Sequence, residues 1–521
     1  MPGFSFKRSG HSSDEINKKI EELGQKPIDI YVTDSLETNI EILKKLFIDV
    51  DVLQLRFFQS DCKKAQKYCI AYCDGLINLN VINDNVIKPL QISTVKVSGK
   101  KQMDDLANLV LTVHSAKKVT QYQEITEAIT YGDTVLFAEG ASEALILDTK
   151  GFQIRAIAEP ENEKNLSGPR EGFTESLLIN LSMIRRKIRS NELKTKYYTL
   201  GKKTKTQIGI CYIEGIVNKQ ILKELYRRLD KIDIDGVLDT NYITELIKDS
   251  PLSPFRTTGY TERPDVVVGK LLEGRIAIVL DGTPDVLTIP YLFIENFQSS
   301  EDYYFNFYYT SFSRFLRIFS FFITISLIGF YVAMAGFHHE VLPLPFLLNI
   351  ASERNSIPFS AAFEAFALLF VFDILRETGS RMPANIGQTM SIVGAIILGQ
   401  AAVDAKIVAS PMIIIVATSG ITSLMVPKMN APIIYIRLFI LILSAMFGFT
   451  GTIVALSIII IHLLHLRSFG IPQISAAGKI RFQEVKDTYI RAPWWLMRMR
   501  WPKSMATDKI RMKNYDKDIQ N

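Results

Sequence analysis

The stretch LRIFSFFITISLIGFYVAMAGF, residues 316–337, decides the fold of this chain. It has twenty-two residues, of which only Arg317 near the start is charged, and it is rich in aromatic side chains. At about 1.5 Å per residue, a helix of this length crosses the ~30 Å hydrocarbon layer of a bilayer. The stretch therefore predicts a transmembrane helix.

The 521-residue chain changes character around this helix. Residues before about 315 mix polar and apolar side chains as a soluble protein does, whereas the residues up to 465 are mostly apolar and a basic tail follows. We expect a multi-domain protein with a cytoplasmic α/β N-terminal region of two subdomains, an α-helical transmembrane bundle and a short amphipathic C-terminal tail. The expected divisions are a disordered N-terminus (1–26), two α/β subdomains (27–150 and 151–298), an interfacial helix (299–315), the transmembrane bundle of about four to six segments (316–465) and the basic tail (466–521).

The positive charge of the chain is concentrated in its tail. The net charge is +6, while residues 466–521 alone hold twelve Lys and Arg against five Asp and Glu. Such a tail suits an anionic membrane face, and because no nucleic-acid-binding motif accompanies it, we expect no nucleic-acid partner. The first thirty residues contain no apolar signal-peptide core, and Arg314 and Arg317 stand at the start of the first span. Both features predict a cytoplasmic N-terminal region.

The N-terminal region shows the alternating patterns of an α/β protein. Apolar residues at helical spacing predict helices, and short β-rich runs beside Asp-Gly or Gly turns predict strands and hairpins. The expected helices are 39–50, 167–188, 221–232, 240–249 and one that begins near Pro264 and ends before Gly274. The expected strands are 52–58, 69–78 and 207–216, with hairpins at 133–151 and around Asp281–Gly282.

The segment 299–315 links this region to the first span. Ser299 and Ser300 are suited to cap a helix whose first turn carries Glu301 and Asp302, and tyrosines follow. Aromatic rings with polar tips favour the headgroup layer. We therefore expect an interfacial helix on the cytoplasmic surface.

Beyond the first span, apolar stretches follow at 359–375, 386–403, 408–426 and 433–465. The last has 33 residues broken by Gly-Phe-Thr-Gly, too many for one straight crossing and few for two. A basic tail in the cytoplasm requires an even number of crossings. Either 433–465 folds back or 359–375 is re-entrant, and the sequence leaves both interpretations open.

Three acids within the apolar half are candidate functional residues: Glu364, Asp373 and Asp404. An ionised side chain costs at least ~2.5 kcal/mol at the middle of a bilayer. These carboxylates should therefore face protein or water.

A polar helix face forms a second candidate. Gln388, Ser391 and Ala395 fall on one face of the segment 386–403, in which glycines permit close approach of another helix. The face either packs against a neighbouring helix or lines a pore in an oligomer, and the spacing is compatible with both.

The tail holds all three tryptophans of the chain. Trp494, Trp495 and Trp501 lie beside basic residues such as Arg498. Trp and basic side chains together anchor a segment to a charged bilayer surface, so we expect these four residues to be membrane anchors. The alternative is a small helical lobe that packs on the soluble region.

No catalytic signature is present in the sequence. GKKTKT at 201–206 fails the phosphate-loop pattern, and His462 and His465 are three residues apart without an acid or thiolate at metal-binding spacing. We therefore expect no enzyme activity, no cofactor and no metal. The four cysteines are expected to be reduced, structural thiols: Cys62, Cys69, Cys73 and Cys211.

Several longer motifs together indicate a family. In chain order they are GPREGF, MIRRKI, YTERPDVV, LLEGRIAIVLDGTP, FQSSEDYY, EAFALLFVFDILRETGSRMP, IGQTMSIVGAIILGQAAV, LRSFGIP and RAPWW. This set resembles the A subunit of GerA-type spore germination receptors from about residue 30 to 503.

The resemblance implies a multi-pass protein of the inner membrane of a bacterial endospore, with a cytoplasmic N-terminal region of two α/β subdomains. It implies a transporter-like B subunit and a lipoprotein C subunit as partners, and a homo-oligomer. The implied role is to trigger germination when nutrients appear.

Three hypotheses of mechanism follow. In the first, this subunit opens an oligomeric ion path; in the second, it is a non-conducting scaffold for other subunits. A secondary transporter ranks last, because the apolar half shows no repeated halves of the kind such transporters have.

Overall fold

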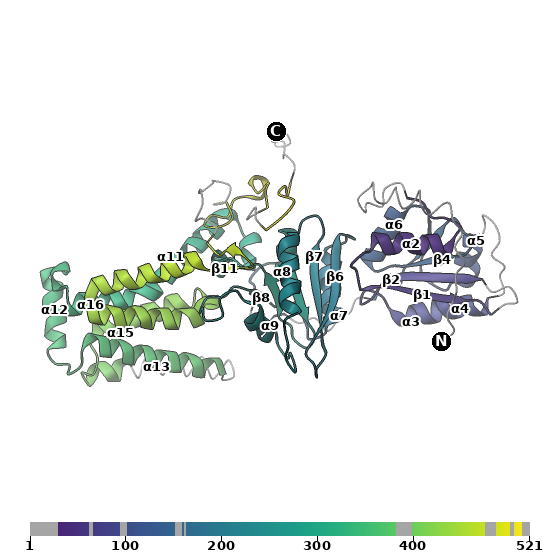
Figure 1. Cartoon of the computed structure of the whole chain (residues 1–521). Helices are drawn as coiled ribbons and strands as arrows, with labels where there is room; N and C mark the ends of the chain where they lie inside the picture. The colour runs from purple at the N-terminus through teal and green to yellow at the C-terminus, as the bar shows by residue number, and fades with distance from the viewer. Residues whose placement is uncertain are drawn as a thin grey trace. The chain divides into compact units, whose positions relative to one another are not determined.

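The computed structural model describes residues 30–61, 66–93, 102–151, 159–160, 163–381, 399–474, 486–500 and 505–512 (Figure 1). The predicted disordered N-terminus, 1–26, lies outside them. The chain forms two compact units. Unit 1 comprises 1–247, 258–290 and 500–510, and unit 2 comprises 248–257, 291–499 and 511–521.

Unit 1 contains two antiparallel five-stranded sheets, with strand orders β1-β2-β4-β5-β3 and β6-β7-β9-β10-β8. The first half is built from α2 (Leu36–Leu46), β1 (Leu53–Gln59), β2 (Lys67–Cys73), α3 (Leu79–Val81), a π-helical turn (Ile82–Ile87), α4 (Lys88–Ile92), α5 (Gln102–Asp105), a second π-helical turn (Leu106–Val110), β3 (Ala116–Val119), α6 (Tyr122–Tyr131), β4 (Thr134–Ala138) and β5 (Ala144–Leu147). The second half is built from α7 (Leu177–Lys187), β6 (Leu193–Leu200), β7 (Thr206–Ile213), α8 (Lys219–Leu229), α9 (Thr240–Ile247), β8 (Gly259–Thr261), α10 (Pro264–Leu272), β9 (Ile276–Leu280) and β10 (Val286–Ile289).

The two halves of unit 1 are repeats of one fold. Both follow the same order of helices and strands, and both sheets have the same strand order. The sequences CIAYCDGLIN (69–78) and GICYIEGIVN (209–218) occupy equivalent places, and each turns at a glycine with positive φ, Gly75 at 80° and Gly215 at 82°. A repeated order, topology and turn together indicate internal duplication.

A buried asparagine holds the start of each repeat in the same way. The Asn39 side chain accepts from Thr33 N–H (2.9 Å) and donates to Thr33 O (2.6 Å). The Asn180 side chain accepts from Thr174 N–H (2.8 Å) and donates to Thr174 O (2.5 Å). Each asparagine lies near the start of a helix and fixes the chain that enters it.

The two repeats share one hydrophobic core. Helices α2 and α6 cover one face of the first sheet, and the segments from α3 to α5 cover the other (Figure 1). Residues of α2 and α6 belong to the same buried cluster as residues of α7 and α10, which cover a face of the second sheet. One buried cluster therefore runs through both repeats.

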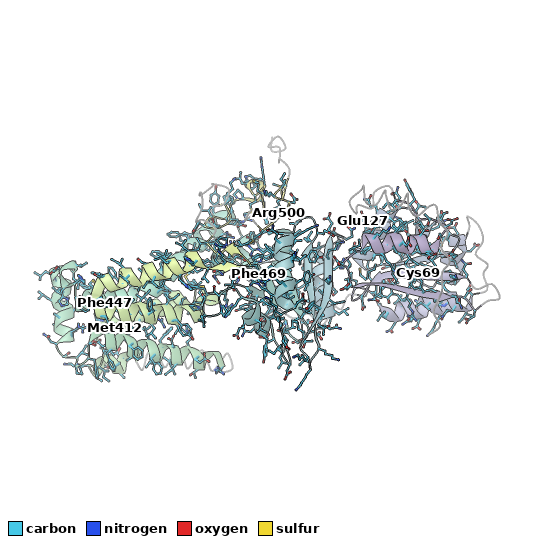
Figure 2. The ribbon with its side chains drawn as sticks, viewed as in Figure 1. Cys69, Glu127, Met412, Phe447, Phe469 and Arg500 are labelled. Atoms are coloured by element: carbon cyan, nitrogen blue, oxygen red, sulfur yellow. The ribbon has the colours of Figure 1, made fainter. Side chains whose placement is uncertain are left out.

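The described cysteines belong to this interior. Cys69 lies among the strands of the first sheet (Figure 2), and Cys73 and Cys211 are buried as well. Burial raises the pKa of the Cys211 thiol to about 11 and raises the pKa of the Cys73 thiol. All three are free and buried, in agreement with the prediction of reduced, structural thiols, while Cys62 lies outside the described residues.

Most predicted elements of unit 1 are confirmed, with one helix wrong at its start. The hairpins at 133–151 and around Asp281–Gly282 are present, as is the helix from Pro264. The helix predicted at 167–188 begins only at Leu177. Residues before it are extended because Phe173 N–H bonds to Glu262 O (2.7 Å), while the Asn180 side chain bonds the backbone of Thr174.

Unit 2 is mainly helical. Its elements are short 3₁₀ turns (Phe293–Phe297, Ser300–Tyr303, His339–Val341, Pro427–Met429 and Trp494–Leu496), α11 (Phe307–Gly336), α12 (Leu344–Arg354), α13 (Ala361–Arg381), α15 (Ser410–Ser423), α16 (Asn430–His465) and the short strands β11 (Arg467–Ser468) and β12 (Ile471–Pro472). Two helical stretches, 307–336 and 427–465, are long and apolar enough to cross a membrane. The separate interfacial helix predicted at 299–315 is absent from this fully described segment: Ser299 begins a 3₁₀ turn, and Asn306 caps α11 itself.

Helix α16 is a hairpin of two helical arms. Gly448 has φ 59° and ψ −139°, which interrupts the helix. Ser444 and Thr452, eight residues apart in sequence, join their hydroxyls at 2.7 Å, a distance that a straight helix excludes. Of the two interpretations left open above, the structure shows that 433–465 folds back.

We expect Asn180→Ala to lower the free energy of unfolding of unit 1 by about 2–4 kcal/mol, because several buried hydrogen bonds worth about 0.5–1.5 kcal/mol each are lost. Asn39→Ala should cost at least as much, since Asn39 also accepts from Tyr122 OH (3.0 Å). The measurement is the urea concentration at which the thiols of Cys73 and Cys211 become reactive.

Asn241→Ala is the matched control, because the side chain of Asn241 is exposed and bonds only at the surface to Glu245 (3.2 Å). Equal shifts in the control and in Asn180→Ala would contradict the assigned role.

Candidate functional site in the helical unit

Glu364 of α13 is buried against the start of helix α15. Its side chain is 1% exposed, and Oε2 accepts from Ala409 N–H (2.9 Å) directly before α15. The guanidinium of Arg354 lies 3.8 Å from Oε1. Glu353 accepts from the next amide, Ser410 N–H (3.2 Å). Two carboxylates therefore neutralise the positive end of α15 and tie α12 and α13 to it.

Asp373, further along α13, is shared by two arginines. Nη2 of Arg437 on α16 lies 3.1 and 3.0 Å from the two carboxylate oxygens, and Nη2 of Arg376 lies 3.1 Å from Oδ1. Arg437 is 2% exposed. The cluster fixes α13 to the first arm of α16 through a charge pair largely removed from water.

The remaining predicted residues of the apolar half do not join these clusters. Asp404 is exposed and accepts from Gln400 Nε2 (3.1 Å). Gln388, Ser391 and Ala395 lie outside the described residues. The structure thus brings Glu364 and Asp373 into ion pairs with separate partners, and the role of all six residues stays a prediction.

A seam of buried hydroxyls was missed at the level of sequence. Thr324 of α11 and Thr422 of α15 join their hydroxyls at 2.8 Å, and Ser419 donates to Thr324 O (3.0 Å). Gly329 permits the close approach of α16, because a Cβ there would lie 2.7 Å from Ile440. The sequence signal that could have predicted this seam is the presence of scattered Ser and Thr in apolar helices, because such residues often lie at contacts between helices.

The tryptophans of the tail keep about half of their surface exposed. Trp494 is 46% and Trp495 48% exposed, and they contact Tyr303 and Phe307 respectively. The backbone of Arg498 accepts from Arg511 N–H (2.9 Å). Trp501 lies outside the described residues. The aromatic rings of the tail and of the start of α11 therefore gather in one place within unit 2.

Arg314 joins the tail to the N-terminal end of α11, which we call its root. Its Nε donates to Asp302 Oδ2 (2.7 Å), and its Nη1 donates to Asp487 Oδ1 (3.0 Å) and to the Asp487 backbone O (2.8 Å). Arg317 donates to Asp302 Oδ1 (2.9 Å), and Tyr303 OH donates to Asp487 Oδ2 (3.0 Å). We call Asp302, Arg314 and Asp487 the root clamp. The sequence alone indicated Arg314 only as a positive charge beside the first span and did not predict its partners.

The chain matches one family model over most of its length. The model is that of the Bacillus/Clostridium GerA spore germination protein, and it matches residues 41–503. The chain belongs to the GerA family. The resemblance drawn from the motifs is therefore confirmed.

Named relatives of the GerA family agree with this assignment. Spore germination protein KA of Bacillus subtilis (strain 168) is 39% identical, over 92% of this chain and 89% of its own. Spore germination protein B1 of the same organism is 35% identical, over 92% and 100%. Spore germination protein GerLA of Bacillus cereus is 34% identical, over 81% and 86%. All three relatives are named as spore germination proteins.

A solved structure also matches. The N-terminal domain of the A subunit of the Bacillus megaterium spore germinant receptor GerK3 is 29% identical, with a TM-score of 0.41, and the match covers 51% of this chain and 98% of that one.

We expect Asp373→Asn to destabilise unit 2 by about 3 kcal/mol, because removing one partner of a buried ion pair leaves uncompensated charge. The measurement is the thermal unfolding midpoint of the full chain in detergent. Adding Arg437→Gln should recover part of the loss, since the unpaired guanidinium is then removed.

Asp404→Asn is the control, because Asp404 is exposed and pairs with no arginine within the described residues. An unfolding midpoint of Asp373→Asn as high as that of the control would refute the pairing argument.

Proposed function

We propose that this protein is a membrane subunit of a nutrient-responsive spore germination receptor, and that it forms an oligomeric ion path which opens when the receptor complex binds a nutrient. Its partners are a transporter-like B subunit and a lipoprotein C subunit in the spore inner membrane. Membership of the GerA family supports the germination role, the family resemblance suggests the partners, and the distribution of polar and apolar side chains in unit 2 supports the membrane location.

The distribution of polarity in unit 2 carries the membrane part of the proposal. Large apolar side chains face outward, as Phe315 (60% exposed) and Ile421 (67%) illustrate, whereas charged groups such as Glu364 and Arg437 are buried. Water favours the opposite arrangement, and an apolar surface of this extent marks contact with lipid or another subunit. The 30 residues of α11 would span ~45 Å, more than the hydrocarbon layer.

The orientation follows from charge. Arg314, Arg317 and the basic tail belong on the cytoplasmic side by the positive-inside rule. Because α16 turns at Gly448, its end returns to the level of its beginning. The tail and the root of α11 then share one side of the bilayer, which agrees with their contacts in the root clamp.

The ion path is assigned to the segment 386–403. Glu364 and Asp373 are engaged by protein partners, so their charges serve to position α13, the helix that precedes this segment. The polar face of Gln388, Ser391 and Ala395 is then the remaining group of predicted residues suited to line a pore. In an oligomer, the same face from each copy would surround the path.

The test compares two positions on opposite sides of that helix in spores. Ala395→Phe should slow nutrient-triggered release of monovalent ions at least tenfold, because the ring obstructs the path. Ile397→Phe, two residues away and therefore pointing to the other side, should leave release near the parental rate. Release is followed with ion-selective electrodes at matched protein levels.

Equal release from both variants and the parent would remove the pore assignment. A scaffold role would then remain, and it predicts that the purified chain in liposomes gives no ion flux with or without Ala395→Phe.

A further inference from the structure

The two repeats of unit 1 differ in what pairs with the segment that follows β2 and β7, residues 76–78 and 216–218; we call this segment the edge of each repeat. In the first repeat, the chain that leaves β5 folds back onto residues 76–78. Gly151 N–H donates to Leu76 O (3.0 Å), Asn78 N–H donates to Thr149 O (2.8 Å), and Ile77 pairs antiparallel with Lys150. The first repeat thus pairs this segment with its own chain.

In the second repeat, the equivalent edge is residues 216–218, and the chain leaves β10 for unit 2 at Pro290. Residues 505–507 of the tail occupy this edge instead. Thr507 N–H donates to Ile216 O (2.8 Å), and Val217 pairs antiparallel with Ala506. These two interactions repeat those of Gly151 with Leu76 and of Lys150 with Ile77.

The tail is fitted closely to this edge. Met505 is 0% and Ala506 4% exposed. A Cβ at Gly274 would lie 3.0 Å from Ala506, so that glycine leaves room for the tail. Thr507 Oγ1 donates to Val217 O (2.9 Å), and the contact therefore includes side chain and backbone.

Arg500 secures the same stretch. Its Nε donates to Leu272 O (2.8 Å) at the end of α10, and its Nη1 donates to Asp508 Oδ2 (2.6 Å). Met499 and Arg500 are consecutive, yet Arg500 belongs to unit 1 and Met499 to unit 2. Asp487, thirteen residues before Arg500 in the sequence, is held by Arg314 in the root clamp.

We infer that the tail is a strap with two fixed ends: residues 505–507 pair with residues 216–218 of the second repeat, and Asp487 fixes the other end to the N-terminal end of α11. A change in unit 1 then acts on α11 through the tail as well as through the chain that enters α11. The inference rests on the proposed germination role and not on whether this subunit conducts ions.

Docking is tested by disulfide trapping in the full chain. Val217 and Ala506 form a non-hydrogen-bonded antiparallel pair, whose Cα atoms lie about 4.5 Å apart, within the range of a disulfide. Val217→Cys with Ala506→Cys should crosslink under mild oxidation, as detected by mass spectrometry. Val217→Cys with Ile510→Cys is the control and should not, because Ile510 is 62% exposed. Failure of the first pair, or equal crosslinking of the control, overturns the docking.

Coupling is tested in spores with Thr507→Pro, which removes the N–H that bonds Ile216. Nutrient-triggered germination, followed by loss of optical density, should slow at least tenfold, while Thr507→Ser, which keeps both donors, should germinate at the parental rate. Parental germination of Thr507→Pro spores overturns the strap.

A rescue separates lost coupling from lost folding. In Thr507→Pro spores that also carry Val217→Cys and Ala506→Cys, oxidation should restore germination and reduction should abolish it again. No recovery in crosslinked spores also overturns the strap. If Ala395→Phe leaves ion release unchanged while Thr507→Pro slows germination, the ion path is rejected and the strap is retained.

Discussion

A charge withdrawn from water needs its counter-charge within the protein, and unit 2 is organised by that requirement. Arg314 draws the turn at Asp302 and the tail at Asp487 onto the root of α11. Arg437 binds Asp373 on α13, and Glu364 accepts from the Ala409 amide directly before α15. Hydroxyl contacts and close glycine approaches fill the space between these points, so the ion pairs select which helices become neighbours.

Local pattern was sufficient for most elements of the fold. Apolar spacing and turn residues predicted α10, the β4–β5 and β9–β10 hairpins and the first long apolar helix. The prediction failed where a distant partner decides the conformation: Phe173 is held extended because its N–H donates to Glu262 O. The duplication was also missed, although CIAYCDGLIN and GICYIEGIVN show it in the sequence.

The candidate site could likewise be predicted from the sequence only in part. The cost of a charge in an apolar helix was enough to expect partners for Glu364 and Asp373, but their identity was not accessible, because Ala409 and Arg437 are remote in sequence. The tail shows a further limit. Composition indicated either a membrane anchor around Trp494, Trp495, Arg498 and Trp501 or a small lobe that packs on the soluble region. It did not indicate that residues 505–507 pair with unit 1, because backbone hydrogen bonds leave little trace in composition.

The position of this last pairing in the chain affects how the protein is made. Residues 216–218 are synthesised long before residues 505–507, and all of the apolar helices lie between them in the chain. The second repeat therefore emerges from the ribosome with the backbone of residues 216–218 unpaired, and unpaired backbone can recruit other strands. The pairing forms only after the helices of unit 2 that lie between the two segments have been translated, so maturation of unit 1 waits for them.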